Sequence, residues 1–274
     1  MEKRLLRELV GEHILGVLGT YPPGRNGMDV HVCGVNVVED TRLHIRIPYG
    51  HQLLENQLVT IHLDNRSGDT HYDEELSIYR LSYKGVVTYK SEFEVVVEAE
   101  EYQVFHGRQC EKEYHSPIYE FPTDHRQTQV IEYSPLTKVP VPDVLCHDNK
   151  AGVLLTYAQK QPHTTVLAYL STYDDDIFFI TFPTTFKSNV LKKNNQCYFV
   201  IDGRATTPLE YTMEWNYNII RGEVYLVPKD SPMFGHLQQV FISKNPYEIE
   251  FFNHPEVEMY HLIPDHMLSP LMAS

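Results

Sequence analysis

The chain repeats itself, and this repeat restricts the possible folds more than any other feature of the sequence. Four short segments recur in the same order, each about 136 residues later. The pairs are GVLGTY at 16–21 with GVLLTY at 152–157, RLHIRIP ending at Pro48 with FFITFP ending at Pro183, IHLDNR ending at Arg66 with FVIDGR ending at Arg204, and YKGVVTY around Gly85 with IRGEVYL around Gly222. Because collinear matches of this kind rarely arise by chance, we predict two copies of one unit, residues 1–139 and 140–274.

Each copy is predicted to consist mainly of strands. Apolar residues alternate with polar ones on either side of short acidic connectors, which is typical of paired strands. The predicted pairs are 30–38 with 42–47 and 165–171 with 177–182. Residues 133–143 contain three prolines and predict an extended connector between the copies.

A few short helices are expected beside the strands. The spacing of Leu5, Leu6, Leu9 and Val10 predicts an amphipathic helix at the start of the chain. Ser231 followed by Pro232 predicts a capped helix, since serine is a favoured N-cap and proline a favoured first residue. Further helices are expected at 52–56, 187–193 and, from its charged composition, 91–107.

The charge of the chain restricts its partners. The net charge of −14 opposes binding to nucleic acid or to anionic membrane surfaces, both of which need a basic face. No apolar run approaches the roughly 20 residues that span a membrane, and the first 20 residues lack the continuous apolar core of a signal peptide. We therefore expect a cytoplasmic protein with reduced thiols, in which Cys33 and Cys197 are buried packing residues.

The segment IFFITFPTTFKSNVLKKNNQCYFVID, residues 177–202, resembles the pyridoxamine 5'-phosphate oxidase-like flavin-binding split-barrel family. Members share a strand ending in threonine, a loop with a hydroxyl and a lysine, a short helix, an asparagine-rich turn and another strand. Thr181, Thr185 and Lys187 match the first three positions. The resemblance implies a mainly β (α+β) fold of two tandem split β-barrels with short flanking helices, which form a pseudo-dimer within one chain.

In this family the threonines and the lysine hold the phosphate of FMN, and Ile180 lies beside them. Hydroxyl and ammonium donors suit a phosphate group. The residues themselves leave an alternative open, in which Thr185 only caps the following helix and Lys187 is a solvated residue of its first turn. Two arginines that many members use are replaced here by Phe186 and Thr165, and the resemblance implies that Thr165, at a binding position of the family, is also a contact of the cofactor.

Aromatic residues near the last repeated strand extend the candidate site. Trp215 and Tyr217 match the neighbourhood of the flavin ring in the family, so the resemblance implies that they contact it. Packing in the core is the alternative for both. In the first copy, Arg46, Gly50 and Gln52 stand where the second copy has Thr181, Thr185 and Lys187. We therefore expect at most one FMN per chain, held by the second copy.

The resemblance implies an FMN-binding oxidoreductase that acts on a small molecule, with unknown substrate and unidentified catalytic residues. The alternative is a flavin-free or haem-handling split-barrel protein with a binding rather than a redox role. Because both barrels lie in one chain, a monomer is expected. His31, His44 and His62 lie on predicted strands, but we expect polar strand positions rather than a metal site. No hydrolase or kinase motif is present, and no Ser-His-Asp set follows from the spacing.

Overall fold

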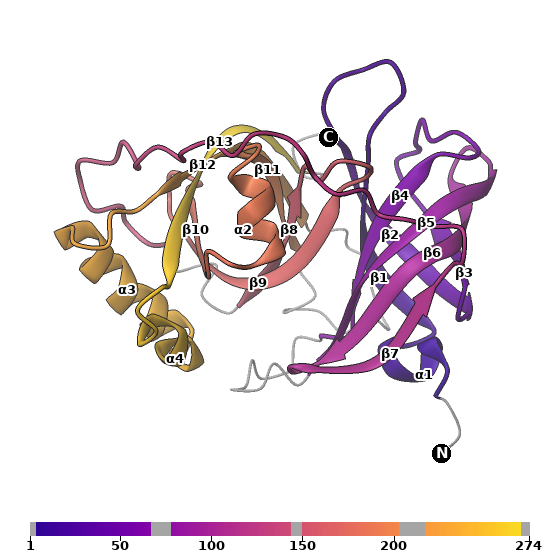
Figure 1. Ribbon diagram of the computed structural model, residues 1–274, viewed down its shortest axis with the longest axis horizontal. Helices are drawn as coiled ribbons and strands as arrows, with labels where there is room; N and C mark the ends of the chain where they lie inside the picture. Colours follow the sequence, from indigo (N-terminus) through magenta and orange to yellow (C-terminus); the bar gives the residue numbers. More distant parts are fainter. Residues whose placement is uncertain (1–3, 67–77, 144–149, 203–216, 270–274) are drawn as a thin grey trace. The chain divides into compact units, whose positions relative to one another are not determined.

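The computed structural model describes residues 4–66, 78–143, 150–202 and 217–269, and these residues form mostly strands (Figure 1). The chain divides into two compact units. The first comprises the described parts of 1–66, 75–124 and Ala158–Thr165, and the second comprises His125–Tyr157 and the described residues from Val166 onward. Ala158–Thr165 lies within the second copy in sequence but belongs to the first unit. The boundary at residue 140 stays a prediction from the repeat.

The first unit contains a closed six-stranded antiparallel barrel. The strand order is β3-β2-β1-β4-β5-β6, and the pairing of β3 with β6 closes the ring, while β7 adds to the outer edge of β6. The strands are β1 (His13–Thr20), β2 (Asp29–Glu39), β3 (Arg42–Arg46), β4 (Leu58–Asp64), β5 (Tyr79–Lys90), β6 (Glu94–His106) and β7 (Gln109–His115).

The second unit repeats this topology strand for strand. Its closed barrel has the order β10-β9-β8-β11-β12-β13, with β13 paired to β10, so each strand takes the place of the one seven numbers earlier. The strands are β8 (Ala151–Thr156), β9 (His163–Ser171), β10 (Ile177–Thr181), β11 (Gln196–Asp202), β12 (Tyr217–Leu226) and β13 (Glu258–Leu268). The predicted mainly β fold with two tandem barrels is confirmed.

The repeated glycines explain why the two copies share their register. Gly85 pairs with Val59, the second residue of β4, and Gly222 pairs with Cys197, the second residue of β11. A β-bulge directly precedes each glycine in its pairing with the next strand. A Cβ atom on either glycine would overlap a backbone carbonyl of that strand, at Glu98 or at Ile263. Only glycine permits this close approach.

Short helices complete the apolar cores. Helix α1 (Leu6–Val10) contributes Leu6, Leu9 and Val10 to the core of the first barrel, as predicted. Helix α2 (Phe186–Leu191) contributes Leu191 to the core of the second barrel. No helix within the described residues is long and apolar enough to cross a membrane.

The outer face of β9, β10 and β13 is covered by α3 (Pro232–Lys244), a 3-10 turn at Pro246–Glu248 and α4 (Ile249–Phe252) (Figure 1). Ser231 caps α3 by accepting a hydrogen bond from Phe234 N at 3.1 Å, and Pro232 is the first helical residue. The predicted start of this helix is therefore confirmed.

Two helix predictions are wrong. Residues 91–107 form β6, because Val95, Val97 and Ala99 alternate into the barrel core with period two. Residues 52–56 form no helix. Gly50 adopts φ 75° and Asn56 φ 66°, so the backbone leaves the right-handed helical region at both ends of this segment.

The connector and the cysteines behave as expected. Residues 133–143 are extended and make isolated bridges from Tyr133 to Leu226 and from Pro142 to Thr172. Cys33 and Cys197 are fully buried and form no disulfide. Burial raises the pKa of the Cys197 thiol, which keeps it protonated and suited to packing.

Candidate functional site

Four of the predicted site residues lie at one corner of the second barrel, where β10 ends and α2 begins. Thr181 is the last residue of β10 and is buried. A turn follows, in which Thr185 N donates to Phe182 O at 3.1 Å, and Pro183 supplies the fixed φ that such turns favour. Thr185 then caps α2 in an extended conformation and accepts from Ser188 N at 3.3 Å.

The two threonine hydroxyls contact each other. Their oxygen atoms are 3.0 Å apart, and Thr185 Oγ1 also donates to Phe182 O at 2.9 Å. A hydroxyl has one proton and two acceptor positions. Because the Thr185 proton goes to Phe182 O, Thr181 is the donor in the contact between the threonines. Both hydroxyl protons therefore have partners within the chain.

Lys187 and Ile180 flank this pair differently. Lys187 is half-buried in the first turn of α2, two residues after the cap. Ile180 faces the opposite way, toward the cluster formed with α3 and α4. Only the backbone of Ile180 is therefore in a position to meet a ligand at the corner.

A second polar cluster adjoins the corner, and the sequence analysis did not identify it. Thr181 is paired with Glu258 across β10 and β13. The Glu258 carboxylate accepts from Tyr260 Oη at 2.9 Å and Ser188 Oγ at 3.4 Å, and pairs with Lys192 Nζ at 3.4 Å. Burial raises the pKa of Tyr260, so its hydroxyl remains a donor. Pairing across two strands leaves no signal in local sequence, which is why these residues were missed.

The remaining predicted site residues do not join this corner. Thr165 belongs to the first unit, where its Oγ1 lies 3.1 Å from His163 Nε2. Tyr217 begins β12 beside the far end of β13, where Ile219 pairs with Leu268, whereas Thr181 pairs with Glu258. At about 3.3 Å per strand residue, these two positions are roughly 30 Å apart along β13. Trp215 lies outside the described residues.

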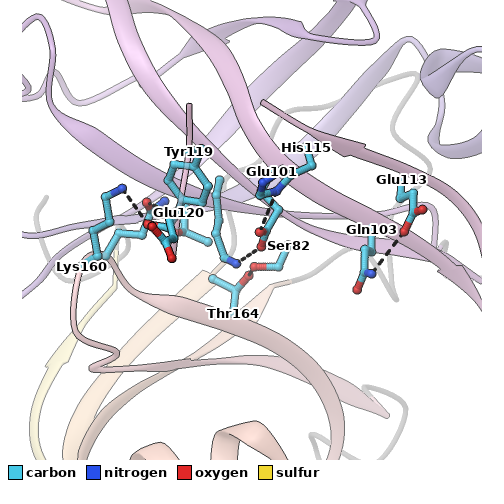
Figure 2. A network of polar contacts seen from close by, with 12 residues as sticks. Ser82, Glu101, Gln103, Glu113, His115, Tyr119, Glu120, Lys160 and Thr164 are labelled. Atoms are coloured by element: carbon cyan, nitrogen blue, oxygen red, sulfur yellow. Dashed lines mark hydrogen bonds and ion pairs between the residues drawn. The ribbon is translucent and has the colours of Figure 1, made fainter. Parts of the chain in front are cut away.

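The first unit has a polar network of its own (Figure 2), centred on the segment Ala158–Thr165. Gln161 is fully buried, and its Nε2 donates to Val59 O at 2.9 Å and to Thr60 Oγ1 at 3.0 Å. Its Oε1 accepts from Tyr119 Oη at 2.8 Å. Every polar atom of the Gln161 side chain therefore has a partner in the first unit.

Charged and hydroxyl groups hold both ends of this segment. Thr164 Oγ1 donates to Ser82 Oγ at 2.8 Å, and Lys160 Nζ donates to Glu120 O at 3.1 Å while lying 4.0 Å from the centre of the Tyr119 ring (Figure 2). These contacts anchor the segment to the first barrel and give it a structural role.

The three histidines singled out in the sequence do not form a metal site. His62 is buried with its Nε2 3.0 Å from Asp64 Oδ2, His31 is half-buried and His44 is exposed. Among the described residues, no group of three or more histidine, cysteine or acidic side chains is arranged to hold a metal ion.

No protein-family model matches the chain, and no curated protein matches it. Solved structures similar to it include Atu2129, a protein of unknown function from Agrobacterium tumefaciens (13% identity, TM-score 0.39, 45% of this chain and 54% of that chain). The heme storage protein HutZ from Vibrio cholerae is similar at 13% identity and TM-score 0.38, over 44% of this chain and 86% of that one. A FAD-binding protein from Mesorhizobium loti is similar at 14% identity and TM-score 0.34, over 43% and 83%. The chain thus spans about half the length of the Agrobacterium protein.

Proposed function

We propose that this protein is an FMN-binding oxidoreductase of the split-barrel type, with one FMN whose phosphate is held at the β10–α2 corner. The observation that carries the proposal is the donor set there: the hydroxyls of Thr181 and Thr185, 3.0 Å apart, with Lys187 two residues further along the chain. The resemblance of residues 177–202 to the flavin split barrels supports the same assignment.

The donors suit a phosphate group energetically. To bind it, Thr185 must give up its hydrogen bond to Phe182 O and Thr181 its bond to Thr185, each worth about 0.5–1.5 kcal/mol, and each gains a bond to a charged oxygen worth about 1.5–3 kcal/mol. Glu258 opposes a nearby anion, but its carboxylate is already held by Ser188, Tyr260 and Lys192. The exchange is therefore favourable, and Lys187 supplies the compensating charge.

Bound FMN would supply the redox chemistry, and the chain would supply the binding and orientation. Thr181 and Thr185 would donate to phosphate oxygens, and Lys187 would neutralise part of the phosphate charge. Thr165 and Trp215 remain proposed contacts on the basis of the resemblance alone, whereas Tyr217, roughly 30 Å from Thr181 along β13, lies too far away to contact the same FMN. The proposed substrate is a small molecule of unknown identity.

Flavin titration followed by fluorescence quenching tests the proposal. We expect one FMN per chain, and Lys187→Ala should weaken binding roughly ten- to a hundredfold through loss of a charge-assisted contact of about 1.5–3 kcal/mol. Gln52→Ala, at the corresponding position of the first copy, is the matched control and should bind as the wild type does. Equal binding by Lys187→Ala and wild type, or two FMN molecules per chain, would contradict the proposed site.

A second candidate is a flavin-free barrel with a binding role, haem being one ligand. The observation that favours it is that both threonine protons already have partners within the chain. An absorption spectrum of the purified protein, repeated after addition of FMN or haem, separates the two. A Soret band with no flavin binding would replace the first proposal by the second.

We also propose that the chain is cytoplasmic and acts as a monomer. The monomer is proposed because one chain already contains both barrels. Light scattering over a range of protein concentrations checks the oligomeric state. A stable dimer at low concentration would contradict the monomer without affecting the flavin assignment.

A further inference from the structure

A serine, a histidine and an aspartate from three distant segments meet on the outer side of the second barrel. Ser134 Oγ lies 2.8 Å from His261 Nδ1, and Asp176 Oδ1 lies 3.0 Å from His261 Nε2. His261 is fully buried on β13, and its ring stacks on Phe178 with centroids 4.5 Å apart and planes at 11°. The histidine ring is therefore held between two polar partners.

Backbone hydrogen bonds hold each partner in place. Ser134 N donates to Leu226 O at 2.8 Å, which attaches the connector to β12. Asp176 closes the β9–β10 turn, where Thr172 N donates to Asp176 O at 3.1 Å and Asp176 N donates to Thr172 Oγ1 at 3.2 Å. The three side chains thus lie on well-anchored backbone, although one segment is an irregular connector.

The contacts assign the proton of a neutral imidazole. A carboxylate beside Nε2 favours the proton on that nitrogen, which leaves Nδ1 to accept from the Ser134 hydroxyl. Asp176 is close to Nε2 without an aligned hydrogen bond. Contacts of this kind often tighten only when substrate binds. A hydroxyl that donates to an imidazole backed by a carboxylate has its general base in position.

A groove lies beside the connector that carries Ser134, although neither Ser134 nor His261 is among its lining residues. It has a volume of about 680 Å³, and its lining includes Tyr133, the preceding residue, and Leu226, whose carbonyl binds Ser134 N. Val227, Phe234 and Met259 add apolar surface, and the lining also includes the charged residues Lys229, Asp230, Glu256 and Glu258. Leu136 N donates to Ser134 Oγ at 3.3 Å, which holds the hydroxyl oxygen beside His261 Nδ1.

We propose that Ser134 is a nucleophile that accepts the acyl group of small apolar esters, an activity separate from the flavin function. Ser134 Oγ attacks the ester carbonyl carbon while its proton passes to His261 Nδ1. The bond to the alcohol oxygen breaks, and the alcohol leaves with that proton. Water, deprotonated by the same nitrogen, then attacks the acyl-serine ester, and its proton is returned to Ser134 as the acid departs.

The purified full chain is treated with a fluorophosphonate probe, and the modified residue is mapped by mass spectrometry. We expect the label on Ser134, none after Ser134→Ala, and a burst of p-nitrophenol from p-nitrophenyl acetate in the wild type only. His261→Gln should lower the labelling rate on the order of a hundredfold or more. Ser91→Ala, at an exposed serine of the first barrel that does not line the groove, should label as the wild type does.

Absence of label on the folded wild type, or label on another residue only, would overturn the proposal. Ser134, His261 and Asp176 would then have only a structural role, in which they hold the connector against the barrel. Circular dichroism establishes that each variant is folded. If His261→Gln does not fold, Asp176→Asn decides in its place, because it preserves shape while removing the charge. A labelling rate at least about tenfold lower supports the proposal, and an unchanged rate rejects it.

Discussion

The corner after β3 in the first barrel and the corner after β10 in the second begin alike and end differently. In both, a hydrogen bond of 3.1 Å closes a four-residue turn, from Gly50 N to Ile47 O and from Thr185 N to Phe182 O. Gly50 then adopts φ 75°, whereas Thr185 adopts φ −71° and starts a helix. The two corners therefore diverge in backbone conformation at this residue position.

The difference shows how a duplicated barrel changes its ends without changing its strands. In the first barrel, Gln52 is bound by Arg25, whose Nη2 donates to it at 3.3 Å, and no hydroxyl pair forms. In the second, the cap threonine brings Thr181 and Lys187 into the same small region. Both barrels have the same strand pairing. A function that depends only on the corner can therefore be kept in one copy and lost in the other.

The largest expected effect on stability comes from the glycines that both barrels have at a β-bulge. Gly222→Ala and Gly85→Ala should each lower the free energy of unfolding by about 3 kcal/mol or more, because the new methyl group overlaps a backbone carbonyl that cannot move cheaply. Urea unfolding measures the change. Gly34→Ala is the control, since open space surrounds its Cβ position, and it should leave stability unchanged or slightly higher. Similar effects at all three glycines would refute the bulge argument.

The next largest effect is the pH dependence of stability that His31, in the first barrel, should contribute. Burial lowers the pKa of His31 to about 4, below the ordinary value of 6.5, so the folded state favours the neutral ring. The unfolded chain binds more protons between these values, and stability should fall as the pH drops from 6.5 toward 4.

Unfolding free energies of wild type and His31→Gln, compared at about pH 7 and about pH 4.5, measure this contribution. The variant should lose roughly 1–3 kcal/mol less than the wild type over that interval. An identical loss in both proteins would show that His31 does not carry the dependence.

Substitutions at the two barrel corners should have a smaller effect on stability. Thr185→Ala removes the α2 cap and should cost about 1–2 kcal/mol, whereas Thr185→Ser should cost little. Gly50→Thr should cost a similar amount, because its φ of 75° disfavours a branched side chain, and it should not create a helix. Thermal unfolding monitored by circular dichroism measures the stability and the helix content of the Thr185 and Gly50 variants. A gain of helix in Gly50→Thr would mean that the residue at this position suffices to convert one corner into the other.

The smallest effect is a stabilisation confined to the second barrel. Gly235 lies within α3, a helix that has no counterpart in the described part of the first unit, and open space surrounds its Cβ position. Gly235→Ala should therefore raise the free energy of unfolding by about 0.5–1 kcal/mol through helix propensity. A lower midpoint in urea would indicate that α3 needs this glycine for packing.

Most of the fold was predictable because its signals are local or repeated. The repeated glycines mark bulges, and alternating apolar residues mark strands. Residues 91–107 were misjudged because their glutamates suggested a helix, although the alternation of Val95, Val97 and Ala99 indicates a strand. The Thr185 cap was foreseen as one of two alternatives, because capping depends only on neighbouring residues.

The site was less predictable where it depends on pairing between distant strands. Glu258 and Tyr260 reach the corner only through the register of β13 with β10. Likewise, Ser134 and Asp176 flank His261 because a connector and a hairpin turn meet on one barrel face. No spacing in the sequence encodes either arrangement.

The burial of Gln161 in the first unit has a consequence for synthesis on the ribosome. Val59 and Thr60 receive their partner only after β8, a strand of the second copy, has been made. At about 5–20 residues per second, translation reaches this segment some seconds after the last strand of the first barrel. During that interval Val59 O and the Thr60 hydroxyl remain open to water, so the first barrel completes its packing only after part of the second copy has been translated.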